Sequence, residues 1–219
     1  MLGLLVANVA AVIIGAFILV AAGEAETPVD ELSLTLIALL QLPLWSGYLG
    51  APLLAAWRKG NGVGRDFALR VKLTDVPFGL LAGVITQVLL VPLLYIPIFL
   101  VFGRQDLSED ARSLTDRADS PVGVVLLILI VVVGAPIIEE LFFRGLLMRS
   151  LERRWGTSAA VLVSSAVFGA VHLQLVQLPA LILFGLVAAV LTVRSGRLGP
   201  AIFAHVAFNA VAVITLLAE

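Results

Sequence analysis

Long stretches of apolar residues alternate with short polar segments along the whole chain. A helix that crosses the hydrocarbon core of a bilayer needs about 20 mostly apolar residues. Strands of a membrane barrel would instead alternate apolar and polar residues, whereas Val122–Val133 is apolar on all sides. The pattern therefore predicts an all-α, polytopic membrane helix bundle of about seven transmembrane helices. The seven stretches are residues 2–22, 32–57, 76–103, 121–148, 157–175, 177–193 and 199–218.

The composition supports this fold class and excludes several classes of function. The chain has 219 residues, of which 61% are hydrophobic and 13% charged, whereas a soluble domain is about 45–50% apolar and about 25% charged. So few charges cannot cover a water-facing surface, which excludes an ordinary soluble enzyme. The net charge of −1 lacks the basic excess of a nucleic-acid-binding protein. The absence of Cys excludes disulfides, Cys-ligated metals and thiol nucleophiles.

No internal repeat or second domain is visible, so we predict one membrane domain over residues 1–219. The first apolar stretch has no preceding Lys or Arg and is longer than the core of a secretory signal, which indicates an uncleaved anchor. Residues 104–120 carry charges of both signs. We interpret them as a solvated linker or surface helix without a functional site.

The Lys and Arg residues of the loops predict the orientation, because they are in excess on the cytoplasmic side. With a cytoplasmic N-terminus, the cytoplasmic loops are 58–75, 149–156 and 194–198. These hold ten Lys and Arg residues, whereas the outer loops hold three. We therefore expect a multi-pass protein of the plasma (inner) membrane with its N-terminus inside and its C-terminus outside.

Three charged residues and both histidines of the chain fall inside predicted spans. Ionisable groups within a bilayer are costly and usually face the bundle interior or a wet cavity. Glu140 and Arg144 are spaced i, i+4, so they can pair along one helix face. Glu139 lies about 100° around the helix axis and has no partner nearby in the sequence. A lone buried carboxylate takes up a proton or finds a distant donor, and the candidates are His172 and His205.

The depth of these side chains can be compared from the turns. Glu139 lies 17 residues before Gly156, where the fourth and fifth spans turn, and His172 lies 16 residues after it. Both are therefore about 25 Å from the turn. His205 is nine residues beyond Gly196, or about 14 Å, so the depths agree if the hairpin of the fourth and fifth spans extends about 10 Å further into the cytoplasm. Asn209 follows His205 one helical turn later. We expect these four polar side chains to converge in the cytoplasmic half of the membrane.

This set of side chains suits the hydrolysis of a peptide bond. A buried Glu can act as general base and acid, and a second His and an Asn can donate to the developing oxyanion. One Glu and two His also match the ligands of a catalytic zinc ion. If the reaction depended on a metal, its ligands would be Glu139, His172 and His205. Other hydrolase patterns (HExxH, G-x-S-x-G, a mid-span Asp pair) are absent.

Three motifs occur in order on successive spans: EExxxR at 139–144, FxxxH at 168–172 and HxxxN at 205–209. Together they resemble the CPBP family, which comprises CAAX prenyl endopeptidases of the Ras-converting type and bacterial relatives such as the bacteriocin-immunity (Abi) proteins. The resemblance covers residues 121–218 as a catalytic core. Residues 1–120 would then be three accessory spans and loops.

The resemblance implies an intramembrane endopeptidase of the glutamate type, formerly classed as a metalloprotease. Its substrates would be membrane-associated proteins, with CAAX-type prenylated ones as the family's example. No cofactor would be required, and zinc is the alternative. Glu139 with His172 would activate water, and His205 and Asn209 would form the oxyanion site. Structural support would come from Glu140, Arg144 and Phe168.

Two readings from other classes remain. One is a non-catalytic immunity or scaffold protein that binds a peptide partner, although a pure binder has no need of an uncompensated Glu139. The other is a small transporter that relays protons through Glu139, His172 and His205. The absence of inverted repeats counts against a transporter.

Overall fold

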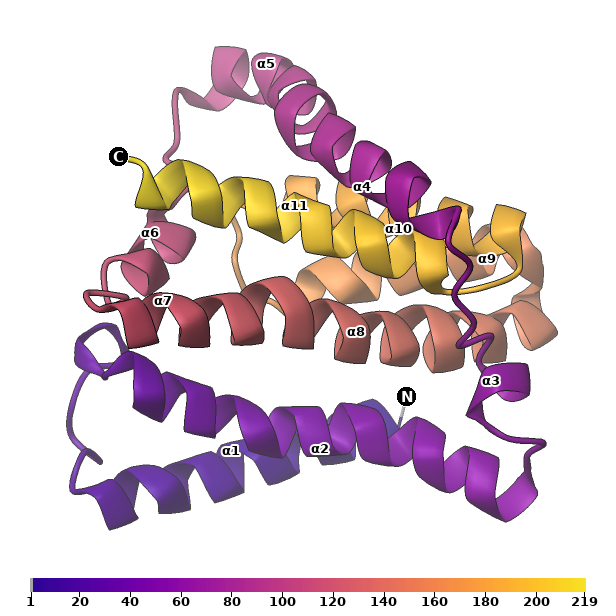
Figure 1. The fold of residues 1–219 in the computed structure, drawn as a ribbon, viewed down its shortest axis with the longest axis horizontal. Helices are drawn as coiled ribbons and strands as arrows, with labels where there is room; N and C mark the ends of the chain where they lie inside the picture. Colours follow the sequence, from indigo (N-terminus) through magenta and orange to yellow (C-terminus); the bar gives the residue numbers. More distant parts are fainter. Residues whose placement is uncertain (1) are drawn as a thin grey trace.

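The chain folds into a bundle of helices that run roughly side by side (Figure 1). The structure is a computed structural model that describes residues 2–219, with the side chains of residues 8–29, 31–58 and 60–219. No strand occurs in the described part of the chain, which confirms the all-α fold. The helices are α1 (Leu2–Ala22), α2 (Leu34–Lys59), α3 (Val63–Asp66), α4 (Asp75–Ile85), α5 (Val91–Phe102), α6 (Glu109–Thr115), α7 (Pro121–Leu127), α8 (Ala135–Glu140), α9 (Arg149–Ala170), α10 (Leu178–Ser195) and α11 (Gly199–Leu217).

Several of these helices join into longer membrane-crossing rods through π-helical turns. The turn Thr86–Leu90 links α4 to α5, and Ile128–Gly134 and Leu141–Met148 continue α7 through α8 into α9. Among the described residues, five helical stretches are long and apolar enough to cross a membrane, and Asn8–Ala22 is a shorter apolar helix. The chain is therefore an integral, multi-pass membrane protein. The five are Leu34–Arg58, Asp75–Phe102, Pro121–Ala170, Leu178–Ser195 and Gly199–Leu217.

The longest stretch, Pro121–Ala170, consists of two helices that fold back on each other. Gly156 separates them, with φ 78° and ψ 169°, a conformation open to glycine because it has no Cβ. The turn thus lies where the predicted fourth and fifth spans meet. Once the stretch Pro121–Ala170 is divided at Gly156, each of the seven spans predicted from the sequence contains helix.

The fifth predicted span is shorter in the structure than in the sequence-based prediction. Helix α9 ends at Ala170 rather than at residue 175, so His172 lies in the turn after the helix and not within a span. The reason is local: Leu173 has a φ of 58°, which cannot continue a right-handed helix. The chain then enters α10, which carries Pro in its first turn.

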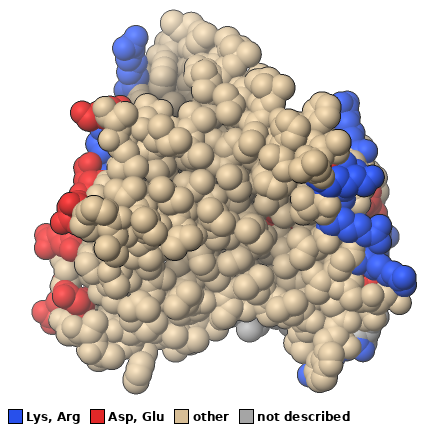
Figure 2. All heavy atoms as spheres, viewed as in Figure 1, with Lys and Arg blue, Asp and Glu red and all other residues tan. Residues whose placement is uncertain are grey.

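Charges gather at the two ends of the bundle (Figure 2). We call the acidic end the loops 23–33 and 103–120 together with the C-terminus, and the basic end the loops 58–74, 149–157 and 194–198. The described side chains between the ends are mostly apolar over the outer surface, as the bilayer requires. The molecule is thus polarised along the axis on which its helices lie.

Small residues let the helices approach closely, as is typical of membrane bundles. On α4, a Cβ at Gly83 would meet the carbonyl oxygen of Ala204 and lie 2.8 Å from the Cβ of Ala207 on α11. Helix α10 packs on α9 in the same way, because a Cβ at Gly185 would lie 3.0 Å from Ser165. These contacts hold α4 against α11 and α10 against α9, next to the polar residues described below.

Candidate active site

The polar residues singled out from the sequence come together from three parts of the chain. Glu139 and Glu140 end α8, and Arg144 follows in the π-helical turn. His172 lies just after α9, and His205 and Asn209 lie on α11. The rings of Phe168 and Phe184 pack among them, and both contact the imidazole of His205.

A fully buried ion pair forms the base of this cluster. Arg144 Nη1 donates to Glu140 Oε1 at 2.8 Å, and neither side chain is exposed. Arg144 Nη2 also donates to the carbonyl oxygen of Gly185 at 3.2 Å. The guanidinium carbon lies 4.4 Å from the centre of the Phe168 ring, a cation–π geometry. The i, i+4 pair expected from the sequence is thus present and tied to α9 and α10.

Glu140 also fixes the orientation of His205. The Nδ1 atom of His205 lies 3.0 Å from Glu140 Oε1. A carboxylate paired with Arg144 only accepts hydrogen bonds, so Nδ1 carries the hydrogen and donates it. The other ring nitrogen, Nε2, then faces Glu139 and lies 4.0 Å from its Oε2 atom. A carboxylate behind an imidazole is the usual way to set which nitrogen of a His is free.

His172 is oriented by a backbone group. Its Nδ1 lies 2.7 Å from the carbonyl oxygen of Phe168, and because a carbonyl only accepts, Nδ1 is again the donor. Nε2 of His172 lies 3.9 Å from Oε2 of Glu139. The two imidazoles therefore direct their free nitrogens at the same carboxylate oxygen.

Glu139 is the buried acid without a direct partner. Within the described residues, its Oε2 atom is buried and makes no hydrogen bond. Distances of 3.9 and 4.0 Å to the imidazoles are too long for direct bonds but suit a bridging water molecule. Asn209 lies nearby on α11 and donates one amide hydrogen to the carbonyl oxygen of Val131 at 2.8 Å. Its amide has a second N–H group.

A cavity of about 610 Å³ reaches this cluster. Glu139, Phe168, His172, His205 and Asn209 all line it. Residues that the sequence did not single out line it as well, and many belong to the segment that we expected to hold no site. Among them are Ser108, Ala111, Leu114 and Thr115 from α6 and its start, and Tyr95, Gln174 and Gln177 from other segments. The mixed charges of residues 104–120 are ordinary for a surface helix, so nothing in the sequence indicated that α6 lines a cavity.

Comparison with known proteins finds a family model that matches the part of the chain that contains Glu139, His172, His205 and Asn209. Residues 121–211 match the family model of the type II CAAX prenyl endopeptidases, Rce1-like. We call residues 121–211 the Rce1-like domain because of this similarity. The match confirms the resemblance drawn from the three motifs for this part of the chain, and the matched model describes endopeptidases.

A relative in Bacillus subtilis (strain 168), described as "Putative membrane peptidase YdiL", agrees with this assignment. It is 33% identical over 116 residues, which are 53% of this chain and 46% of that protein. The chain thus matches about half the length of its curated relative. None of the solved structures gives a significant match.

The donor atoms of the Rce1-like domain do not form an evident metal site. Among the described residues, no three His, Asp or Glu side chains are grouped so as to hold a metal ion. Each imidazole has one nitrogen engaged and one directed at Glu139. We therefore derive the chemistry of the Rce1-like domain from its own side chains and leave metal dependence to a direct test.

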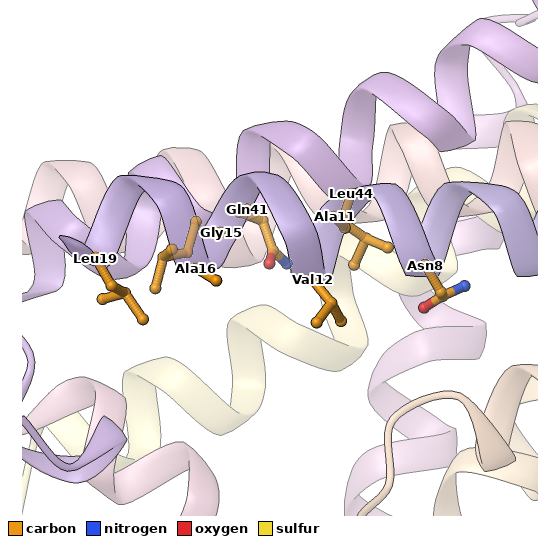
Figure 3. Close-up of a pocket in the computed structure, with 9 residues that line it drawn as sticks. Asn8, Ala11, Val12, Gly15, Ala16, Leu19, Gln41 and Leu44 are labelled. Atoms are coloured by element: carbon orange, nitrogen blue, oxygen red, sulfur yellow. The ribbon is translucent and has the colours of Figure 1, made fainter. Parts of the chain in front are cut away.

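A second hollow lies outside the Rce1-like domain, between α1 and α2. Figure 3 shows its lining, which is apolar apart from Asn8 and Gln41. Its volume is about 410 Å³. None of the residues that line this hollow is titratable, so it offers no group for acid–base catalysis.

Proposed function

We propose that the protein is an intramembrane endopeptidase that hydrolyses peptide bonds of membrane-associated polypeptides with a water molecule activated by Glu139. One observation carries this proposal. The buried Oε2 atom of Glu139, at the inner end of the cavity, faces the free nitrogens of two imidazoles at 3.9 and 4.0 Å. A structural acid in a membrane bundle would be paired directly, as Glu140 is.

The geometry suits a water held between Glu139 and His172. Such a water donates one hydrogen to the Glu139 carboxylate and the other to Nε2 of His172, so an oxygen lone pair is directed into the cavity. When that oxygen attacks the substrate carbonyl carbon, its proton passes to Glu139. Glu139 then gives this proton to the leaving amide nitrogen as the C–N bond breaks. General base and acid catalysis of this kind contributes about 10²–10⁴-fold to the rate.

In this proposal His205 and Asn209, which both line the cavity, stabilise the oxyanion. With the free Nε2 described above, His205 could not donate a hydrogen bond, so this role requires a second state of the imidazole in which Nε2 carries a hydrogen as well as Nδ1. In that state Nε2 of His205 donates into the cavity, and the second N–H of Asn209 can join it. Loss of one oxyanion donor typically reduces kcat about 10²–10³-fold.

Glu140, Arg144 and Phe168 act as positioning residues in this scheme. Glu140 holds Nδ1 of His205, and the carbonyl oxygen of Phe168 holds Nδ1 of His172. Arg144 neutralises Glu140. Neither Glu140 nor Arg144 lines the cavity, so they act through the imidazole rather than on the substrate.

The setting of this activity is the plasma membrane, with the basic end in the cytoplasm. The partners are the bilayer and a membrane-associated polypeptide, the class that includes prenylated CAAX proteins. Neither a cofactor nor a nucleic acid enters the scheme. Zinc dependence is the alternative form of the same protease.

A comparison of peptide termini tests the proposal. Membranes from a bacterial host that expresses the wild type are compared with membranes that contain Glu139→Gln, and new N-termini are identified by mass spectrometry. We expect termini that appear with the wild type and are absent with Glu139→Gln. The matched control is Glu31→Gln, the same change on an exposed residue near the acidic end, which should leave the termini present. The same termini from Glu139→Gln membranes would contradict the proposal.

A further inference from the structure

Two side chains that line the cavity have a buried oxygen atom without a hydrogen bond in the described part of the chain. One is Oε2 of Glu139, on which the proposed reaction depends, and the other is Oε1 of Gln87. Gln87 lies midway along the α4–α5 rod. Polar side chains in a membrane bundle normally bond across to a neighbouring helix, because a buried polar group without a partner is costly. The free oxygen of Gln87 therefore points to a partner outside the chain.

An irregular turn of the rod carries this side chain. Gln87 belongs to the π-helical turn Thr86–Leu90, in which the N–H of Val91 donates to the carbonyl oxygen of Thr86, five residues earlier. Pro92 follows directly and has no N–H, so the ordinary bond to the residue four positions before it cannot form. Turns of this kind occur frequently at functional sites. The rod thus departs from a regular α-helix at the position where Gln87 lines the cavity.

The packing of α4 on α11 gives the level of Gln87 along the bundle. Both helices start at the basic end, and at three successive turns a Cβ on a glycine would meet a side chain of the other helix. The pairs are Asp75 with Gly199, Gly79 with Phe203, and Gly83 with Ala207, each 124 positions apart. The same spacing places Gln87 level with Val211, which also lines the cavity. Val211 is six residues beyond His205 and two beyond Asn209, or about 9 and 3 Å along the axis.

The amide of Gln87 matches the hydrogen-bonding groups of a peptide bond. It has an acceptor oxygen and two N–H donors, and a peptide group has one N–H and one carbonyl oxygen. A polypeptide that is extended for cleavage within a membrane gives up its helical hydrogen bonds, and no water is present in the hydrocarbon core to replace them. Beyond Gln87 the helix α5 diverges from α11 (Figure 1). The glutamine therefore lies on a wall of the cavity where an extended chain needs polar partners.

We propose that Gln87 binds the backbone of the substrate polypeptide, with Oε1 accepting from a peptide N–H and the amide nitrogen donating to a peptide carbonyl. Because an extended chain spans about 3.3–3.6 Å per residue, the bound peptide group lies within about three residues of the scissile bond. Gln87 is thus a substrate-binding residue outside the catalytic cluster, and it selects an extended backbone rather than a particular side chain. This inference rests on the proposed function and adds to it how the substrate is held.

The first test needs no substrate. Gln87→Met keeps the unbranched shape of the side chain and removes its hydrogen-bonding groups. A glutamine that supports the fold would lower the unfolding midpoint when replaced, whereas the loss of an amide that is unpaired in the free protein leaves the midpoint unchanged or raises it. We expect a midpoint in detergent micelles no lower than that of the wild type. A lower midpoint overturns the proposal.

The second test measures binding in the inactive Glu139→Gln background, where the peptide stays intact. The probe is a fluorescent synthetic peptide that spans a bond cleaved by the wild type, and its Kd is obtained from fluorescence anisotropy in micelles. Adding Gln87→Met should raise the Kd about tenfold, as expected for the loss of two hydrogen bonds. The matched control is Gln105→Met, the same change on an exposed residue outside the cavity, which should leave the Kd unchanged.

A set of probes with one peptide N–H replaced by an ester oxygen identifies the bound group. Within three residues of the scissile bond, one such ester should weaken binding when Gln87 is present and cause no further loss with Gln87→Met. An equal Kd with and without Gln87→Met overturns the proposal, as do ester effects that are the same in both proteins. Retained cleavage by Glu139→Gln would instead refute the proposed function, so the two failures are distinguishable.

Discussion

Replacing Arg144 tests whether a buried ion pair supports the site. Arg144→Met keeps a long side chain but removes the guanidinium, which donates to Glu140 at 2.8 Å and to the carbonyl oxygen of Gly185 at 3.2 Å. Glu140 is then a fully buried carboxylate whose remaining partner is Nδ1 of His205 at 3.0 Å. Water cannot replace the lost contacts, because both side chains are completely enclosed.

The expected cost follows from this enclosure. Removing one member of a buried ion pair destabilises a protein by about 3–5 kcal/mol, because an uncompensated charge is left behind. Replacing both members is much milder, since no charge then remains to be solvated. We therefore expect Arg144→Met to lose about 3–5 kcal/mol of unfolding free energy, and the double variant Glu140→Gln/Arg144→Met to lose less than the single one.

The assay is reversible unfolding in detergent micelles, followed by tryptophan fluorescence. The control is Arg112→Met, which breaks the exposed pair with Glu219 and should leave the unfolding midpoint unchanged, because exposed ion pairs contribute little. Wild-type stability in Arg144→Met would refute the reasoning. A double variant less stable than Arg144→Met would also refute it, since the penalty would then not arise from the unpaired Glu140.

Three further predictions address packing, catalysis and metal dependence. Gly83→Ala should lower the unfolding free energy by about 1–3 kcal/mol, because its Cβ would meet Ala204; Gly50→Ala, with no atom within 4 Å of its Cβ, should show no loss in the same unfolding assay. His172→Gln should reduce kcat about 10²-fold or more with an unchanged unfolding midpoint. A lower kcat accompanied by a lower unfolding midpoint would point to a structural role. Cleavage by the purified protein should survive exhaustive chelation; loss of activity that zinc alone restores would favour a metal-dependent reaction.

The helices and the ion pair could be predicted because both follow from local rules. A bilayer requires about 20 apolar residues per span, so the spans stand out in the hydrophobic pattern. The Glu140–Arg144 pair depends on i, i+4 spacing within one helix, which needs no knowledge of the rest of the fold. The turn at Gly156 was likewise indicated by the glycine between two apolar stretches.

The contacts between segments could not be predicted in the same way. The bond between His205 and Glu140 depends on how α11 is rotated against α8, and no spacing in the sequence sets that angle. His172 lies in a turn because Leu173 adopts a left-handed backbone, which a leucine does not signal. The contribution of α6 to the cavity arises because its short loops fold it over the bundle, so its composition alone indicated only a surface helix.

The most direct test of the central claim is the kcat of Glu139→Gln on a peptide cleaved by the wild type. Glutamine keeps the size of the side chain but cannot take a proton from water. The account predicts that kcat falls at least about 10²-fold, the contribution of general base catalysis, while the unfolding midpoint stays at the wild-type value. A Glu139→Gln protein that cleaves the same bond at the wild-type rate would contradict it.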